Sequence, residues 1–428
     1  MVIAKIGDYK DKQVTIKGWV YNFRSSGKIA FLQIRDGSGF IQAIVEKTSV
    51  DEASWQVVQE LTQESSVSLT GQVSEHPKQP GVYELQVTKL ELIQKAEEYP
   101  ISNKEHGPEF LLDNRHLWLR SKKQWAIQRV RNIIINAMYE YLNQEGFIKI
   151  DAPILTPTSC EGTTELFELE YFDEQKAYLS QSGQLYIEAG IFAHGRVFDF
   201  GPTFRAEKSK TRRHLSEFWM MDAEAAFVEH AENMQIQEGL IQHVAKKVLE
   251  LGSEELAILE RDTAPLEKLQ KPFKRMTHAE AVAFLQKNGS DIGDRDDLGA
   301  DDETKLTENS DVPIFVEKWP KEIKAFYMKR DDNDADLVLG ADLIATEGFG
   351  EVIGGSERET DYSLLVKRME EENLPQEPFQ WYLDLRKYGS VPHSGFGVGL
   401  ERLVAWMTGT HHVRETIPFP RMIHRLTP

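Results

Sequence analysis

Short runs in which apolar and polar residues alternate dominate the first 95 residues of the chain. This period of two is typical of half-buried β-strands, and Gly-rich or polar turns separate the runs. The segment between the third and fourth runs, Asp51–Leu61, has the pattern of a short helix. The predicted strands are Gln13–Val20, Ala30–Arg35, Gly39–Glu46, Ser66–Gln72 and Val82–Leu92. Five strands with a helix after the third suggest a small Greek-key barrel of the oligonucleotide-binding (OB) type.

A helical period replaces the alternation after a polar connection over residues 96–115. Apolar residues recur at helical spacing from Ile127 to Tyr141, and Gly146 supplies a stop. Strand-like and helical segments then alternate to the end of the chain. The clearest strands are Tyr178–Ser182, Val197–Phe204, Phe218–Phe227, Phe315–Lys318 and Phe349–Gly354. These patterns predict an α+β protein with a barrel domain over 1–95 and a larger mixed domain over 116–428.

Composition narrows the class of protein. A chain of 428 residues exceeds the usual length of one domain, and 40% hydrophobic residues suffice for sizeable cores. No apolar run reaches the length of a membrane span, and the first ten residues lack the apolar stretch of a signal peptide. The single cysteine, Cys160, excludes an intrachain disulfide, and one cysteine without an HExxH motif does not favour a zinc site. We expect a cytoplasmic protein without a membrane segment.

Charge argues against a general binder of nucleic acid, because the net charge is -19. The acidity is uneven: residues 1–100 carry 11 Lys and Arg against 13 Asp and Glu, whereas residues 285–312 carry nine acids against three bases. We interpret 285–312 as a solvated insertion with no packing demand. A nucleic-acid contact would have to come from a localised surface.

A basic loop between two strands is the first candidate for chemistry. The strand ending at Phe204 continues into Arg205 and Glu207, and the returning strand carries Phe218, Asp222 and Glu224. Alternation places Arg205 and Glu207 on one face, and the residues of the returning strand on another shared face. The loop over 208–214 contributes five side chains that can be cationic, a combination that could hold a polyphosphate. A solvated hairpin tip with ion pairs explains the same hairpin equally well.

Two further elements flank this hairpin. Near the C-terminus, glycines at 395, 397 and 399 leave one face of a strand bare for a flat ligand, and a helix over Leu400–Thr408, stopped by Gly409, holds Arg402 nearby. Before the hairpin, Pro153 in a strand pattern indicates an edge or interface position. Neither a Walker A sequence nor a Rossmann fingerprint occurs in the chain.

In this order the three elements resemble motifs 1, 2 and 3 of the class II aminoacyl-tRNA synthetases, at about 144–155, 203–224 and 395–408. A barrel followed directly by the catalytic core is similar to the aspartyl, asparaginyl and lysyl subgroup. Within it, the bacterial asparaginyl enzymes match best, through the segments starting at Glu161, Ser180, Arg205 and Tyr388. The resemblance implies an antiparallel catalytic sheet flanked by helices, and activation of L-asparagine with ATP for attachment to tRNA(Asn).

The resemblance also implies roles around ATP and Mg²⁺. Arg205 would contact the α-phosphate, Glu207 the adenine amino group and His214 the γ-phosphate. Phe218 would stack on adenine, with Arg402 covering its other side. Asp342 and Glu351 would be the metal ligands, since Mg²⁺ prefers oxygen donors. For a single acid in this strand–turn region, a turn-capping carboxylate is the alternative.

For the amino acid, the resemblance implies contacts from Glu161, Ser182, Gln184, Asp222, Glu224 and Arg358. Arg358 would read the side chain. Aspartyl enzymes usually carry Lys where this chain has Ile187, so one positive charge is missing, which favours a neutral amide over a carboxylate. Asp222 departs from the pattern, because asparaginyl enzymes commonly carry Glu there and aspartyl enzymes carry Asp.

In the barrel, the resemblance implies that Phe31 and Gln42 contact the central anticodon base, with Arg24 nearby. Ordinary barrel core is the alternative for Phe31. Motif 1 forms the dimer interface throughout the class, so a homodimer is expected. Three rival functions stay open: an aspartyl enzyme, archaeal-type or non-discriminating; a paralogue that makes asparagine or modifies tRNA; and a non-catalytic single-strand-binding protein.

Overall fold

The computed structural model describes residues 1–102, 104–160, 165–209 and 211–428 of the chain. These residues form two units, Met1–Gly107 and Pro108–Pro428, and each unit has its own hydrophobic core. Among the described residues, no helix combines the length and the apolar character that crossing a membrane requires.

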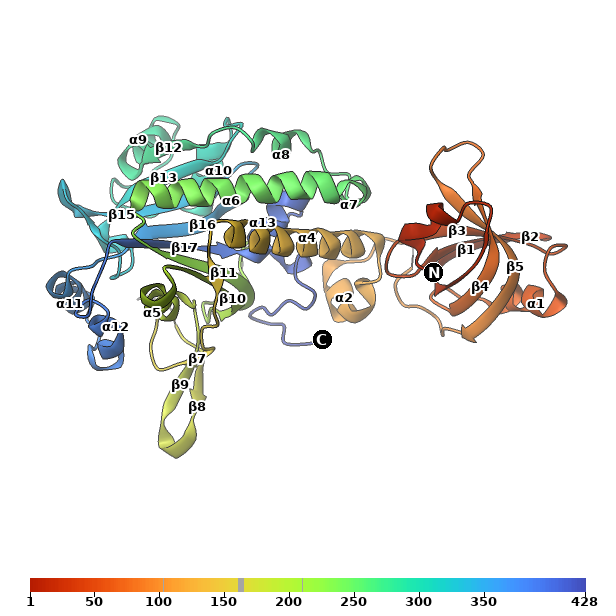
Figure 1. The fold of residues 1–428 in the computed structure, drawn as a ribbon, viewed down its shortest axis with the longest axis horizontal. Coiled ribbons are helices and arrows are strands. Elements are labelled where there is room, and N and C mark those ends of the chain that lie inside the picture. The colour runs from red at the N-terminus through yellow and green to blue at the C-terminus, as the bar shows by residue number, and fades with distance from the viewer. Residues whose placement is uncertain (103, 161–164, 210) are drawn as a thin grey trace. The chain divides into compact units, whose positions relative to one another are not determined.

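The N-terminal unit is a closed barrel in which the strands follow the order β1-β2-β3-β5-β4 (Figure 1). The strands are β1 (Gln13–Ser26), β2 (Ile29–Arg35), β3 (Phe40–Glu46), β4 (Ser66–Glu75) and β5 (Tyr83–Gln94), with helix α1 (Glu52–Glu60) after the third. Along β1 to β3, buried and more exposed residues alternate, because every second side chain points into the barrel. The predicted five-stranded OB-type barrel is confirmed.

The second unit is built on a sheet whose six central strands are antiparallel. In spatial order the strands are β12 (Lys274–Thr277), β13 (Ile314–Pro320), β15 (Asp334–Ala345), β16 (Gly350–Glu357), β17 (His393–Gly399), β11 (Glu217–Ala226), β10 (Arg196–Phe204) and β6 (Ile148–Lys149). Strand β14 (Arg330–Asp331) pairs with β15 off this path. A smaller sheet contains β7 (Leu155–Thr156), β9 (Lys176–Leu179) and β8 (Glu168–Glu170). The antiparallel sheet that the resemblance implied is therefore present.

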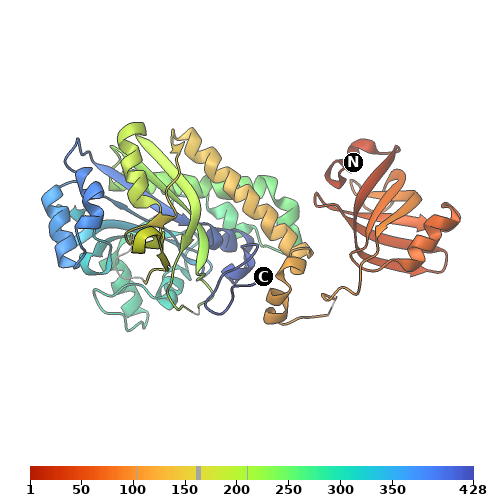
Figure 2. The ribbon, with the colours of Figure 1, turned by 90° about the horizontal axis from the view of Figure 1, so that it is seen from below.

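The longest helices cover one face of the large sheet (Figures 1 and 2), whereas shorter helices pack near the two ends of its other face. The main core joins apolar side chains of the sheet to those of α4 (Lys122–Gln144), α6 (His230–Leu251) and α13 (Leu400–Thr408). The predicted long helix ends as expected before Gly146, whose φ of +81° suits glycine. The other helices are α2 (Pro108–Asp113), α3 (Arg115–Trp118), α5 (Gln184–His194), α7 (Ser253–Ile258), α8 (Ala264–Lys268), α9 (His278–Lys287), α10 (Ala300–Thr307), α11 (Tyr362–Glu371) and α12 (Gln380–Asp384).

Two predictions about segments are wrong. The polar connection does not extend to residue 115, because α2 and α3 begin the second unit at Pro108 and Arg115 is buried against backbone carbonyls, including that of Pro418 at 2.8 Å. The acidic segment 285–312 is not a solvated insertion. Its apolar residues Leu285, Ile292, Leu298 and Leu306 are buried in one core cluster with Trp319. The many acidic residues around them made these four apolar positions inconspicuous in the sequence. The four side chains nevertheless pack the segment against β13.

Candidate active site

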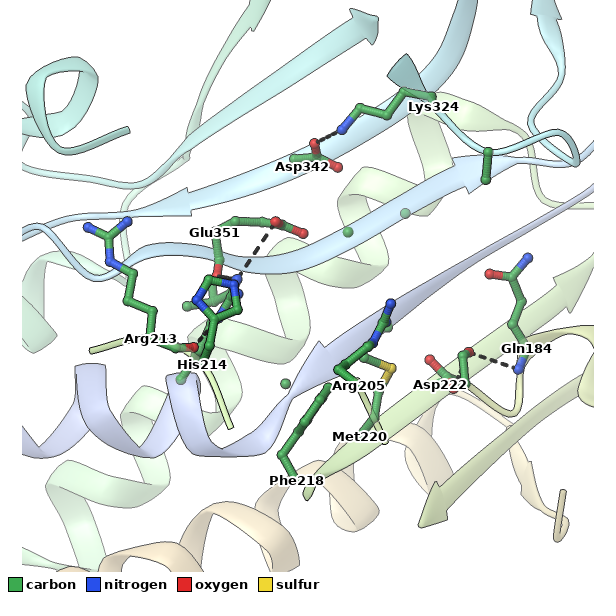
Figure 3. A pocket seen from close by; sticks show the side chains of 18 of the residues that line it. Gln184, Arg205, Arg213, His214, Phe218, Met220, Asp222, Lys324, Asp342 and Glu351 are labelled. Atoms are coloured by element: carbon green, nitrogen blue, oxygen red, sulfur yellow. Dashed lines mark hydrogen bonds and ion pairs between the residues drawn. The ribbon is translucent and has the colours of Figure 1, made fainter. Parts of the chain in front are cut away.

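A cavity of about 370 Å³ lies against the large sheet, on the face that α4 and α6 leave uncovered. Alternation along β11 separates the two faces: Met221 and Ala223 belong to the core under the helices, whereas Met220 and Asp222 line the cavity. Figure 3 shows the cavity from close by, with Gln184 and Asp222 at one end and Arg213, His214 and Glu351 toward the other. The cavity therefore has two ends of different chemistry.

The hairpin β10–β11 contributes the middle of the cavity. Strand β10 ends at Phe204, so Arg205 and Glu207 lie in the following loop and not on the strand face that alternation predicted. Both still line the cavity, together with Phe218. The prediction that Arg205 and Glu207 share a strand face is therefore wrong, although both side chains lie at the same cavity.

Cationic side chains gather at one end. Arg402, from the first turn of α13, donates from Nη1 to the Glu351 carbonyl at 2.9 Å and from Nε to the Arg213 carbonyl at 3.4 Å. Burial, aided by the charge of Arg402, lowers the pKa of His214 to about 4. His214 is thus neutral at pH 7, while the surrounding guanidinium groups provide positive charge suited to a polyphosphate.

Arg213 is a cavity residue to which sequence reasoning gave no individual role. Its Nη1 forms an ion pair with Glu303 of α10 at 2.6 Å, and its Nη2 donates to the Gly348 carbonyl at 2.6 Å. The basic loop pointed toward Arg213, but nothing local indicated a partner 90 residues away in the acidic segment.

The glycine run on β17 serves three different purposes. A Cβ at position 395 would meet the Glu224 carboxylate at 2.0 Å, and one at 397 would meet Asp222 Oδ1 at 2.6 Å. A Cβ at 399 would meet nothing within 4 Å. The glycines at 395 and 397 thus leave room for the buried carboxyl groups of Glu224 and Asp222. Of the three glycines, Gly397 and Gly399 line the cavity.

Asp342 on β15 and Glu351 on β16 face the same small space. A Cβ at Gly354 would lie 2.9 Å from Glu351 Oε1 and 3.6 Å from Asp342 Oδ1, so glycine leaves room between the two oxygens. The other oxygen of Asp342 accepts from Lys324 Nζ at 2.5 Å. Burial raises the pKa of Asp342 to about 7 against the effect of Lys324, and the charge of Glu351 adds to the rise. Two oxygen donors that repel each other fit a divalent cation.

No cluster of three or more potential metal ligands occurs among the described residues, so the protein would supply this pair and the remaining ligands would come from water or phosphates. Nothing in the sequence indicated a role for Lys324, because its partner Asp342 lies 18 residues later, on strand β15.

The opposite end of the cavity is lined by Ser182, Gln184, Asp222 and Arg358. Asp222 Oδ2 accepts from Ser182 Oγ at 2.8 Å and from the Gly183 amide at 2.9 Å. Burial raises the pKa of Asp222. This end combines hydrogen-bond donors and acceptors in fixed positions, as recognition of a small polar molecule requires.

Glu224 does not line the cavity but holds Arg358, whose Nε donates to Glu224 Oε1 at 3.0 Å while Nη1 donates to Ser356 Oγ at 2.6 Å. Burial raises the pKa of Glu224, although the adjacent Arg358 guanidinium opposes the rise and pairs with the carboxylate. Arg358 therefore lines the cavity while its guanidinium is paired with the Glu224 carboxylate, which largely balances its positive charge.

The resemblance assigned two further positions, Glu161 and Ile187, to the end of the cavity that would hold the amino acid. Glu161 lies outside the described residues. Ile187 does not line the cavity: it is fully buried and packs with Ile191 and Val197. Because Ile187 lies on the side of α5 that faces the sheet, its side chain does not reach the cavity.

In the barrel, Arg24, Phe31 and Gln42 lie on the outer surface of β1, β2 and β3. Phe31 is half-buried and outside the core cluster, so ordinary barrel core is the wrong interpretation for it. The Arg24 guanidinium stacks over its ring at 4.7 Å. Gln42 donates from Nε2 to Glu84 Oε1 at 2.6 Å. The outer face thus presents a cation and an aromatic ring side by side.

Comparisons with known proteins agree with this architecture. Residues 107–423 match the model of the family "tRNA synthetases class II (D, K and N)", and residues 14–93 match that of the "OB-fold nucleic acid binding domain". An asparagine–tRNA ligase of Pelotomaculum thermopropionicum is 53% identical over 100% of this chain and 99% of its own length.

Solved structures are similar throughout. The asparaginyl-tRNA synthetase of Pyrococcus horikoshii complexed with asparaginyl-adenylate has a TM-score of 0.96 and 45% identity, covering 100% of this chain and 99% of its own. The Entamoeba histolytica enzyme with asparaginyl-adenylate has a TM-score of 0.88 and 32% identity, with 98% and 97% covered. With its family match, its barrel and a cavity lined by residues of motifs 2 and 3, this chain belongs to the class II tRNA synthetases of the D, K and N group.

Proposed function

We propose that this chain is an asparagine–tRNA ligase: it activates L-asparagine with ATP to asparaginyl-adenylate and transfers the asparaginyl group to the 3′ end of tRNA(Asn). The observation that carries the proposal is a single cavity with two different ends. Cationic groups lie at one end, and Asp222 and Arg358 lie at the other, where the charges are balanced. The 53% identity to an asparagine–tRNA ligase over the whole chain supports it.

The nucleotide would occupy the cationic end. Arg205 is suited to the α-phosphate, His214 to the γ-phosphate, and Glu207 to the adenine amino group. Phe218 would stack on one side of the adenine and Arg402 would cover the other. In the first step a carboxylate oxygen of asparagine attacks the α-phosphorus, and the bond to the β-phosphate breaks with release of pyrophosphate. Since that carboxylate is already ionised at neutral pH, no general base is needed, and the guanidinium groups of Arg205 and Arg402 would stabilise the charge that builds on phosphorus.

In the second step a hydroxyl oxygen of the terminal ribose of tRNA attacks the carbonyl carbon of the adenylate. The bond from that carbon to the phosphate oxygen breaks, AMP leaves, and the hydroxyl proton passes to solvent or phosphate. Here too the chain contributes position and charge stabilisation in place of a nucleophile of its own.

Asparagine would occupy the other end, between Gln184, Asp222 and Arg358, with Ser182, Glu161 and Glu224 in support. A carboxylate side chain would face Asp222, a second negative charge, and an arginine that Glu224 already balances. A neutral amide avoids this repulsion and can donate to Asp222 while accepting from Arg358. Mismatched polar groups in such sites permit discrimination on the order of 10⁴.

Mg²⁺ is part of the proposal because Asp342 and Glu351 present oxygen donors to one space beside Gly354. A divalent cation held there would neutralise phosphate charge. Glu351 and Asp342 orient toward the cationic end of the cavity, next to Arg402 and Lys324, which supports assigning them to the nucleotide half.

We assign the anticodon to the outer face of the barrel, with Phe31 stacking on the central base and Gln42 and Arg24 adding polar contacts. This assignment would make the barrel the anticodon-binding domain and the second unit the catalytic domain. Stacking of one base on an aromatic ring contributes about 1–3 kcal/mol.

A homodimer through motif 1 is also proposed. Around the edge strand β6, three apolar side chains are unusually exposed: Ile148 at 47%, Ile154 at 43% and Leu155 at 46%. An exposed apolar group beside an edge strand favours association. Sedimentation velocity should give a dimer, and a monomer at micromolar concentration would contradict the assignment.

The test of function is ATP–pyrophosphate exchange with asparagine and aspartate compared under Mg²⁺. Exchange with asparagine alone is expected. Exchange with aspartate would instead assign the chain to the aspartyl enzymes, which carry Asp at the position of Asp222. Exchange with neither would refute the proposal.

A further inference from the structure

The second turn of α5 carries a carboxylate that is fully buried, on Glu188. Three groups from the C-terminal part of the chain bind it. The Tyr382 hydroxyl donates to it at 2.7 Å, Arg386 Nη2 donates at 2.9 Å, and His393 Nε2 lies 3.0 Å from Oε2. The Arg386 and His393 side chains are also fully buried. A buried ion pair of this kind is seldom needed for stability alone, because desolvation offsets much of its attraction.

Glu188 also reaches the cavity through one neighbour on its own helix. Gln184 lies one turn earlier and donates from Nε2 to Glu188 Oε1 at 3.3 Å. Although burial alone would raise it, Arg386 and His393 hold the pKa of Glu188 below its usual range, so the group is an ionised carboxylate that only accepts hydrogen bonds. Its partner on Gln184 must therefore be the amide nitrogen. The carboxamide oxygen is left on the side of the cavity, as Figure 3 shows.

The same network supports the other contact to the amino acid. Arg386 donates from Nε to the carbonyl of Glu359, the residue after Arg358, at 2.9 Å. The Arg358 amide donates to the His393 carbonyl at 3.0 Å. Glu188 and its partners thus hold Gln184 on α5 and Arg358 at the end of β16 in one rigid arrangement.

We infer that Glu188, fixed by Arg386 and His393, is a positioning residue for the amino-acid end: it orients the Gln184 carboxamide so that the oxygen accepts a hydrogen bond from the α-ammonium group of the substrate. This inference rests on the proposed function, since it takes the occupant to be an amino acid. Without the carboxylate, the Gln184 amide could turn its N–H groups toward the ammonium, and two donors would then face each other.

The first variant is Glu188→Gln, measured by ATP–pyrophosphate exchange. An amide at 188 can donate as well as accept, so it no longer dictates the orientation of Gln184. The KM for asparagine should rise about tenfold or more, as expected for loss of one hydrogen bond to a charged group. The KM for ATP should change by less than about twofold, which is the usual error of additivity. A variant that merely loosened the fold would raise both.

A double-mutant cycle with Gln184→Ala separates orientation from general damage. Once the carboxamide is absent, Glu188→Gln has nothing left to misorient and should raise the KM for asparagine by less than about twofold more. If the two substitutions multiply their effects in full, Glu188 acts independently of Gln184 and the inference is wrong.

Glu188→Asp covers the case in which Glu188→Gln does not fold. It keeps the charge beside Arg386 but withdraws the carboxylate from Gln184 by one methylene, so the same selective rise in the asparagine KM is expected. The matched control is Glu64→Gln, which breaks another buried Arg–Glu pair, with Arg35 in the barrel, and should leave both KM values unchanged. Equal rises for asparagine and ATP in the Asp variant would overturn the inference, whereas absence of exchange in the unmodified chain would overturn the proposed function itself.

Discussion

At the scale of single residues, the cationic end of the cavity depends on a few side chains with fixed partners. Arg402 is held by the carbonyls of Glu351 and Arg213, so its guanidinium has little freedom before any nucleotide binds. Preorganised charge of this kind stabilises a transition state more than a ground state. By contrast, Arg358 at the other end is balanced by Glu224 and contributes hydrogen bonds more than net charge.

Substitution Arg402→Ala should therefore lower the rate of asparagine-dependent pyrophosphate exchange by about 10²–10³-fold, the range for loss of one preorganised donor. The rate at saturating substrates is the measurement. Arg295→Ala is the control, because this arginine lies at the surface and pairs with Glu322. A fall of less than about tenfold would show that Arg402 does not stabilise the reacting phosphate.

A second residue-scale prediction concerns acid stability. Burial, helped by the charge of Arg414, lowers the pKa of His412 to about 4. Its Nδ1 also accepts the Arg414 amide at 3.2 Å, which protonation at that nitrogen would prevent. Between about pH 6.5, the unfolded value, and pH 4 the unfolded chain binds the proton first, so this histidine makes stability fall as the pH falls through that window.

The variant His412→Asn cannot be protonated and can still cap the following turn through its side-chain oxygen. The loss of melting temperature between pH 7 and pH 5 should be smaller in this variant than in the unmodified protein, while the exposed His116→Asn should change nothing. An equal loss in both His412→Asn and the unmodified protein would refute the assignment.

At the scale of elements, helix α10 connects the acidic segment to the site. The segment packs through its buried leucines, and Glu303 then reaches Arg213 in the motif 2 loop. The side chains of this pair are 14% and 10% exposed, so the charges are largely removed from water. Because Arg213 borders the nucleotide end, we expect α10 to hold the loop in place over the phosphates.

Replacing Glu303 by Gln should raise the KM for ATP about tenfold, since a largely buried guanidinium would lose its counter-charge. The KM for asparagine should stay the same, because Gln184 and Arg358 lie at the opposite end. Steady-state exchange at varied ATP is the measurement, and Glu308→Gln, at the exposed residue that directly follows α10, is the control. An unchanged KM for ATP would show that the contact is structural only.

At the scale of the whole molecule, the two units have separate cores and separate tasks in the proposed reaction. The exchange reaction needs only the catalytic unit, whereas charging of tRNA would need both. A defect confined to the barrel surface should therefore appear in one assay and not in the other.

Phe31→Ala should raise the KM for tRNA(Asn) in aminoacylation by about 10- to 100-fold, in line with loss of one stacked base, and leave asparagine-dependent exchange unchanged. Tyr9→Ala is a matched control, because Tyr9 also carries a cation over its ring, Lys12 at 5.6 Å. A fall in exchange, or equal effects of both substitutions on tRNA, would contradict the anticodon assignment.

What the sequence alone determined was local. Alternation of period two predicted the barrel strands and the β10–β11 hairpin, and helical spacing with a terminal glycine predicted α4 and α13, whose Gly409 has a φ of +69°. The order of three elements pointed to the family and to the residues of the cavity. The strand and helix patterns depend on neighbours a few positions apart, so each part of the chain carries its own signal.

Only the tertiary structure decided which distant groups meet. It paired Glu303 with Arg213, Lys324 with Asp342, and Glu188 with Arg386, pairs separated by 90, 18 and 198 residues. It also packed Ile187 into a small core with Ile191 and Val197, and it buried the apolar residues of the acidic segment that charge alone had predicted to be a solvated insertion. A periodic pattern shows that a face is buried but not against what, because the partner of a buried charge is set by packing across the whole sheet and not by its own neighbours.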